Sequence, residues 1–285
     1  MNKIVKERFF NNKFSVIGLI IFLLILIVVL IGPIISPYGR DVMNYRLANK
    51  APSFSHWLGT DELGRDYLTR LLYGGRISLQ VGFLATALSM IIGVVIGGIS
   101  GYYGGKIDLI LMRFSEIVNS FPFLPFAITL SAIFGSQVSP QMRMNIIMAI
   151  IGLISWTGLA RMIRGQILSL KEQEFMLAAK ALGISDRNRI FRHLIPNTFA
   201  YIIVNATLGI AGAILTESGL SFLGLGVIQP TPTWGNMIQA AQNPYILAHR
   251  PWLCLPPGIA IFITVMSINL IGDGLRDALD PKSDN

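Results

Sequence analysis

The charged residues of this chain are grouped so that long stretches contain none of them. Asp, Glu, Lys and Arg make up only 13% of its 285 residues, and seven segments of at least 17 residues lack all four. These segments are 14–39, 77–105, 117–142, 144–160, 193–216, 218–249 and 251–272. An α-helix needs about 20 apolar residues to cross the hydrocarbon layer of a bilayer, so most of these segments are long enough to span it.

Six of the seven segments also have the composition of a spanning helix. The exception is 218–249, where Pro230, Pro232, Pro244 and several amide side chains would leave backbone groups unpaired in lipid, so we interpret it as a loop. The predicted spans are 14–35, 77–100, 115–135, 145–163, 198–221 and 255–272. The expected fold class is therefore an all-α membrane protein with six transmembrane helices.

Composition argues against a solvated globular protein, a disordered tail and a disulfide-stabilised scaffold. Hydrophobic residues make up 53% of the chain, and a single cysteine, Cys254, cannot form an internal disulfide. The net charge of +8, from 23 basic and 15 acidic residues, could attract nucleic acid. In a membrane protein it instead marks the cytoplasmic side, so the expected surroundings are a lipid bilayer and no nucleic acid.

The first apolar segment has two interpretations. It follows four basic residues and could be a cleaved signal peptide, but its apolar part is longer than the usual 7 to about 15 residues. No small-residue cleavage site follows it. We therefore expect an uncleaved first span.

The basic residues predict the orientation of the chain. With the N-terminus inside, 15 of the 23 basic residues fall in cytoplasmic segments, and seven of these lie between the fourth and fifth spans. The opposite assignment would place most of them outside, against the positive-inside rule. Both termini are predicted to be cytoplasmic, although segment 36–76 places six basic residues outside.

The segment 164–197 is the one long polar insertion predicted inside. Ser169 and Glu172 have the spacing of a capping box, and the helix that they start can run to Leu182 before Gly183 supplies a left-handed residue. A second start signal lies at 185–186, and Pro196 is expected to end that helix before the fifth span. The loop is predicted to be two short helices joined by a glycine turn.

The first of these helices has an unusual composition for a loop. Ala178 and Ala179 would let another backbone approach closely, beside the apolar residues Phe175, Met176 and Leu177, which are expected to be exposed. Such a face either docks on a protein partner or lies on the lipid surface, and periodicity alone does not separate the two.

The same helix carries a family resemblance. The run Ala178-Ala179-Lys-Ala-Leu-Gly183, with twelve residues between Gly183 and Pro196, resembles the loop through which importer-type ABC permeases dock on their ATPase subunits. The chain departs from the family pattern at Leu177, His193 and Ile195. The resemblance implies a coupling role for Phe175, Met176, Leu177, Ala178, Ala179, Leu182, Gly183 and Pro196.

Three further stretches, 56–79, 217–227 and 272–281, resemble the second permease subunit of dipeptide, oligopeptide and nickel importers. The resemblance implies a type I ABC importer permease fold with a cytoplasmic coupling helix, in the inner membrane of a prokaryote. It also implies a second homologous permease, two ATP-binding cassette ATPases and an extracytoplasmic peptide-binding protein as partners. The chain then divides into 1–76, with the first span and an external loop, and a five-helix permease core, 77–285, with the coupling loop.

Transport of di- or oligopeptides is the function that this resemblance implies, and three alternatives stay open. A nickel or metal-chelate importer shares the architecture, and an ion-coupled secondary transporter would need no ATPase. A membrane enzyme is suggested by Gly98-Ile99-Ser100-Gly101, but no histidine is placed to activate Ser100. We interpret Gly93, Gly97 and Gly101 instead as a helix-packing face.

Cofactor and metal sites are not expected in this chain. Three histidines and one cysteine are scattered without ligand spacing, and no phosphate-binding loop occurs. ATP and Mg²⁺ are therefore expected in the partner ATPases, and the chain itself is expected to be non-catalytic.

One acidic residue lies next to an apolar span. Glu217 could belong to a solute pathway or gate, since a carboxylate in a membrane is costly unless paired or wetted. The interpretation that we adopt is that the fifth span ends before Glu217, which then lies at the outer interface with Ser218 and Ser221 as partners.

Overall fold

The structure is a computed structural model that describes residues 3–134 and 138–279. These residues form helices and connecting loops without a β-strand, and an isolated bridge joins Thr60 to Asp66. The helices are α1 Lys3–Asn11, α2 Lys13–Ile35, η1 Tyr45–Leu47, α3 Tyr67–Tyr103, α4 Gly105–Ser120, α5 Phe123–Phe134, α6 Pro140–Lys171, α7 Glu174–Ala181, α8 Asp186–Asn188, the π-helical η2 Arg189–Leu194, α9 Ile195–Asn197, α10 Phe199–Phe222, α11 Trp234–Ile238, η3 Gln239–Gln242, α12 Pro244–His249, η4 Pro251–Leu253 and α13 Leu255–Leu279.

Five helices in the described chain are long and apolar enough to cross a membrane: α2, α3, α6, α10 and α13. They correspond to five of the six predicted spans. Helix α3 has 37 residues and starts ten residues before the predicted boundary. It does so because Asp66 caps it, accepting a hydrogen bond from the Thr69 backbone N–H at 2.8 Å.

The predicted third span, 115–135, is not one continuous helix. Helix α4 ends at Ser120 and α5 begins at Phe123, with Phe121 and Pro122 between them. Proline has no amide hydrogen to donate, and it disfavours helical geometry at the residue before it; Phe121 is accordingly extended, with φ −71° and ψ 123°. The prediction of a single helix over this segment is therefore wrong for its described residues, and a sixth transmembrane helix stays a prediction.

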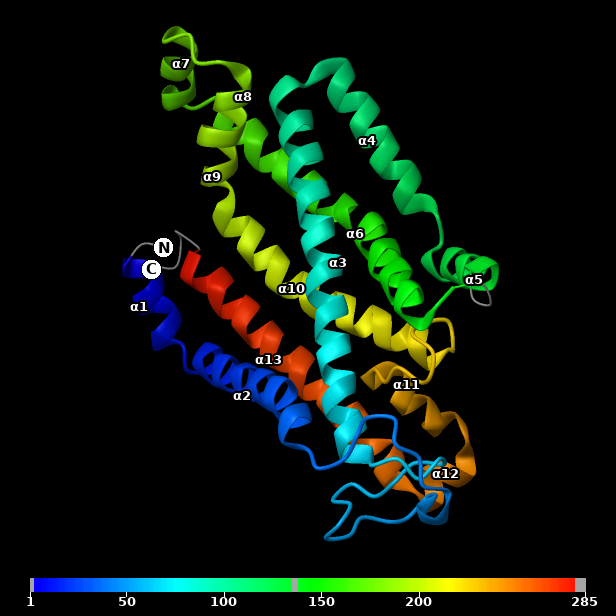
Figure 1. Ribbon diagram of the computed structural model, residues 1–285. Coiled ribbons are helices and arrows are strands. Elements are labelled where there is room, and N and C mark those ends of the chain that lie inside the picture. Colours follow the sequence, from blue (N-terminus) through cyan, green and yellow to red (C-terminus); the bar gives the residue numbers. More distant parts are fainter. Residues whose placement is uncertain (1–2, 135–137, 280–285) are drawn as a thin grey trace.

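Helix α3 runs through the centre of the molecule (Figure 1). It packs against α6 along much of its length and against α10, while α13 packs between α10 and α2. Figure 1 shows α7 projecting at one end, which we call the α7 end, and α12 with the loop 36–66 at the opposite end, the α12 end. Helix α1 packs against α13, so the two ends of the described chain lie close together.

The predicted glycine face of α3 is confirmed. Each of Gly93, Gly97 and Gly101 faces α6 so closely that a Cβ atom would meet α6 atoms: those of Leu159, the Ala160 carbonyl oxygen and the Arg164 carbonyl oxygen, respectively. Small residues at four-residue spacing let the two helix backbones approach each other in this way.

We expect Gly97→Ala to separate α3 from α6. Its methyl group would lie against the Ala160 carbonyl oxygen, closer than carbon and oxygen can approach. Overpacking of this kind costs about 1–3 kcal/mol, so the thermal unfolding midpoint of the purified protein should fall.

The control is Gly165→Ala on α6, where a Cβ would meet nothing within 4 Å. That change should leave the midpoint unchanged or raise it, because alanine favours a helix by about 1 kcal/mol over glycine. Equal midpoints for the two variants would contradict the packing account.

Candidate functional site

Helix α7 ends as the sequence predicts. Gly183 has φ +69°, a left-handed conformation that glycine adopts without steric cost. The Ile184 N–H donates to the Ala179 carbonyl oxygen and the Gly183 N–H to the Lys180 carbonyl oxygen, both at 3.1 Å. These two bonds form a Schellman motif, which satisfies carbonyl groups at the helix end and turns the chain sharply.

The start of α7 differs from the prediction. Ser169 does not cap a helix, because α6 continues through it to Lys171, and Gln173 precedes α7 without a side-chain capping bond. Continuation of α6 lets Leu170 pack against the buried cluster that contains Ile163 and Ile167. The capping-box prediction from Ser169 and Glu172 is therefore wrong, and α7 is shorter than expected.

The apolar residues of α7 divide between two faces. Met176 and Ala179 are buried, and Met176 packs with Ile167 and Leu194, so the prediction that Met176 is exposed is wrong. Phe175, Leu177, Ala178 and Leu182 remain exposed, with Leu182 reaching 79%. Since Phe175, Ala178 and Leu182 are spaced i, i+3 and i+7, they share one helix face. We call this exposed apolar face the α7 face, and Figure 1 shows helix α7 projecting at one end of the molecule.

The second half of the loop is helical, but not in the predicted form. A short α-turn from Asp186 leads into the π-helical segment η2, in which the Ile195 N–H donates five residues back to the Ile190 carbonyl oxygen. Pro196 does not end the run, which continues through Asn197 and breaks at Thr198. Segments of π-helix are rare in proteins, and those that occur are often located at functional sites.

A cluster of four side chains ties the loop to the neighbouring helix ends. The Tyr102 hydroxyl donates to Asp186 Oδ1 at 3.0 Å, and the Arg189 guanidinium lies 5.6 Å from the centre of the Tyr102 ring while pairing with Asp186. Lys171 Nζ donates to the Tyr102 carbonyl oxygen at 3.1 Å. This Tyr102 cluster holds α3, α6 and the loop together, and sequence reasoning missed it.

A second ion pair joins α4 to α6 nearby. Arg164 donates through Nε and Nη2 to the two carboxylate oxygens of Asp108, at 2.5 and 2.6 Å. The hydrogen bonds from Arg164 hold the pKa of the Asp108 carboxyl below its usual value. The Ser100 hydroxyl, considered above as a nucleophile, is fully buried and donates to the same carboxylate.

Glu217 lies inside α10 and not beyond it. The helix continues to Phe222, and Glu217 is 0% exposed, so the interpretation that places it at an outer interface after the helix end is wrong. Ser221, one of the two expected partners, donates to it at 2.6 Å, and Ser78 on α3 donates at 3.2 Å. Ser78 in turn accepts from the Trp234 N–H of α11 at 3.1 Å. The carboxylate therefore joins three helices, and its role in a pathway or gate stays a prediction.

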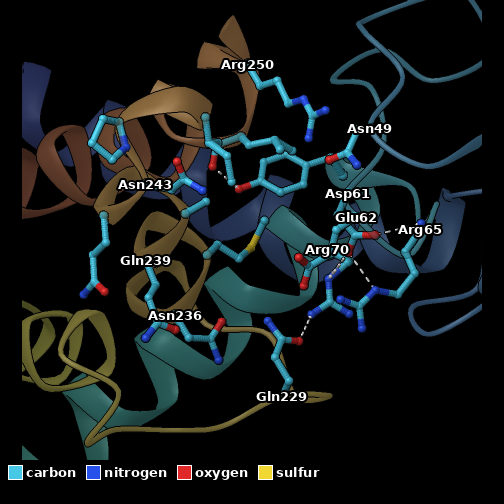
Figure 2. Close-up of a pocket in the computed structure, with 17 residues that line it drawn as sticks. Asn49, Asp61, Glu62, Arg65, Arg70, Gln229, Asn236, Gln239, Asn243 and Arg250 are labelled. Carbon is cyan, nitrogen blue, oxygen red and sulfur yellow. Dashed lines mark hydrogen bonds and ion pairs between the residues drawn. The ribbon is translucent and has the colours of Figure 1, made fainter. Parts of the chain in front are cut away.

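A cavity of about 750 Å³ lies at the α12 end between the segments 49–70 and 229–253. Figure 2 shows Arg70 pointing between Asp61 and Gln229 at its base. Arg70 is only 1% exposed and also approaches Asp41 Oδ1 at 3.3 Å. A charge buried to this degree needs such partners, so this cluster fixes the loop 36–66 against α3 and the segment after α10.

The described residues contain no group of three His, Cys, Asp or Glu side chains that could hold a metal ion. His56 is the histidine nearest to such an arrangement, and its Nδ1 lies 2.8 Å from Asp66 Oδ1. That pair orients the residue that caps α3.

Comparison with known proteins assigns the chain to a family. Residues 93–285 match the family described as binding-protein-dependent transport system inner membrane component. The chain belongs to this family. Residues 3–52 match the N-terminal transmembrane domain of oligopeptide transport permease C. The fold is thus that of type I ABC permeases.

Curated relatives cover nearly all of the permease. The oligopeptide transport system permease protein OppC of Haemophilus influenzae is 44% identical over 281 residues, 97% of this chain and 87% of the relative. The dipeptide transport system permease protein DppC of Alkalihalophilus pseudofirmus is 42% identical over 95% of this chain and 87% of its own length. OppC of Bacillus subtilis is 42% identical over 96% of this chain and 88% of its own length.

We expect Tyr102→Phe to loosen the loop between α6 and α10 of this permease. The change removes the hydroxyl that bonds to Asp186 but keeps the ring under Arg189. Loss of one such bond costs about 0.5–1.5 kcal/mol, so hydrogen exchange in α7 and η2 should accelerate up to about tenfold. Tyr103→Phe, which alters an exposed neighbouring ring, is the control and should leave exchange unchanged. Equal exchange in the two variants would contradict the role of the cluster.

Proposed function

We propose that this chain is one of two permease subunits of an ATP-driven importer that carries di- or oligopeptides into the cytoplasm. The observation that carries the proposal is its 42–44% identity, over nearly its full length, to oligopeptide and dipeptide permeases. The five long apolar helices and the exposed α7 face agree with a subunit that spans the membrane and meets a partner at one end.

In this proposal the α7 end faces the cytoplasm. The predicted cytoplasmic segment 164–197 lies at this end, as does the connection between α3 and α4 (Figure 1). The two termini are then also cytoplasmic, and the cavity at the α12 end faces the extracytoplasmic binding protein that delivers the peptide.

The α7 face would occupy a groove on an ATPase subunit. It is apolar and small at Ala178, which suits close approach of another surface, while Met176 and Ala179 anchor the helix to its own chain. The partner ATPases would bind ATP and Mg²⁺, and this subunit would be non-catalytic.

Movement of the ATPases would reach the membrane through the Tyr102 cluster. When ATP brings the two ATPases together, α7 is carried with them, and Gly183 sets the angle between α7 and the following helix. Because Tyr102, Lys171 and the loop are bonded together, α3 and α6 follow the loop as one body. A second homologous permease would move in the same way, and the pathway between the two switches between outward and inward access.

The direct experiment is uptake by purified complex in proteoliposomes. We expect ATP on the α7 side to drive accumulation of tripeptides, and a proton gradient without ATP to drive none. Accumulation of nickel chelate in place of peptide would contradict the substrate, and uptake that needs only the proton gradient would contradict the mechanism.

The docking surface can be tested with Ala178→Arg. A guanidinium on the α7 face would be desolvated without a partner, so the ATPases should fail to co-purify and uptake should fall more than tenfold. The control, Asn188→Arg, adds the same charge to an exposed position of the same loop outside α7. Retention of the ATPases and full uptake by the Ala178→Arg complex would exclude docking through this face.

A further inference from the structure

A cavity of about 330 Å³ lies half-way along the three central helices α3, α6 and α10. None of the residues that line it is charged, and the polar ones are Thr86, Ser89, Ser155, Asn205 and Thr216. At about 1.5 Å per residue, Thr86 is roughly 25–30 Å from either end of α3, so the cavity is near the middle of the spans. Sites for small ligands have volumes of about 300–1,000 Å³.

The wall of this cavity contains a buried polar group without a protein partner. Thr86 is only 7% exposed, and within the described residues no hydrogen-bond partner reaches its Oγ1. Leaving such a hydroxyl unpaired is costly, and native structures seldom do so without a functional reason. Gly209 lies opposite, where a Cβ would come within 3.1 Å of Thr86 Cγ2, so the absence of a side chain there keeps the cavity open.

The outer side of the cavity is open and lacks large side chains. Ser155 and Gly158 on α6 and Gly212 on α10 are exposed, and a Cβ on either glycine would meet nothing within 4 Å. Elsewhere the spanning helices expose large apolar residues such as Leu24, Ile91 and Phe262. This opening is therefore unlike the surface that the chain presents to lipid.

We propose that this cavity is the half of the solute pathway that this chain contributes, and that it holds a peptide through backbone N–H and C=O groups. The inference rests on the proposed function, and it adds which residues contact the peptide and which peptide side chains the pathway accepts. Hydroxyl and amide side chains can both donate and accept hydrogen bonds, which matches the alternating groups of a peptide backbone. Because the wall of the cavity carries no charge, the complex transports peptides with acidic and with basic side chains at similar rates.

The first test removes the unpartnered hydroxyl. Thr86→Val keeps the shape of the side chain, and we expect ATP-dependent uptake of trialanine by the complete complex to fall about fivefold to tenfold. The matched control is Thr264→Val on α13, which removes another buried hydroxyl that has no partner among the described residues and lines none of the cavities described above. It should leave uptake unchanged. Equal effects of the two substitutions would overturn the assignment.

The second test introduces charge. Wild-type complex should take up Ala-Lys-Ala and Ala-Glu-Ala at similar rates. Ser155→Asp should favour the lysine peptide and Ser155→Lys the glutamate peptide, each by about tenfold, since opposite charges attract strongly away from water. A purely structural role for Ser155 would lower both rates together, and that result would overturn the proposal.

The third test fills the cavity. Gly158→Leu and Gly212→Leu should abolish uptake while both permeases and the ATPases still co-purify, because the added side chains enter empty space. Loss of the second permease from these complexes would show that its helix fills the cavity and would overturn the proposal.

If wild-type complex imports a nickel chelate but no peptide, the proposed function fails by itself. The assignment of the cavity to the pathway is then judged by uptake of that chelate in Thr86→Val and Thr264→Val.

Discussion

The close packing of α3 against α6 is the contact on which the rest of the structure depends. The glycine face of α3 lets the two helix backbones meet, and the same helix carries the functional clusters at both ends and in the middle. Arg70 and Ser78 hold the α12 end, Thr86 lines the central cavity, and Tyr102 binds the coupling loop. In a bilayer this packing matters more than helix propensity, because lipid provides no hydrophobic drive for helices to associate.

This arrangement offers a physical route from the ATPases to the solute. The α7 face is free to meet a partner because Met176 and Ala179 attach α7 to its own chain from the other side. The Tyr102 cluster then joins the loop to α3 and α6, the helices that form two of the three walls of the central cavity. In the mechanism proposed here, a displacement at α7 reaches the cavity through helices that are packed and hydrogen-bonded to one another.

Much of this could be predicted from the sequence, for definite reasons. Charge-free stretches locate five spans because hydrocarbon excludes charge, and the glycine repeat of α3 and the left-handed Gly183 follow from steric rules that act locally. The break at Pro122 follows from an equally local rule, because proline interrupts a helix, but hydropathy alone does not reveal it. The false cap at Ser169 arose because a local signal cannot reveal that the helix before it continues. Gln229 and Asp186, which pair with Arg70 and Tyr102, are 159 and 84 residues away from them in sequence, and Ser78, which donates to Glu217, is 139 residues away on another helix, so no local pattern indicates these contacts.

The central claim is that the coupling loop moves together with α3. It is tested most directly by joining the two covalently. In a Cys254→Ser background, cysteines at positions 102 and 186 would be linked by a short bis-maleimide in the assembled complex, and ATP-dependent peptide uptake would be measured before and after linking. The account predicts that linking maintains or raises uptake, because the two positions keep their separation throughout the cycle and the link replaces the bond between Tyr102 and Asp186 that the cysteines remove. Loss of uptake on linking, with ATPase subunits still bound, would show that the loop must move relative to α3 and would contradict it.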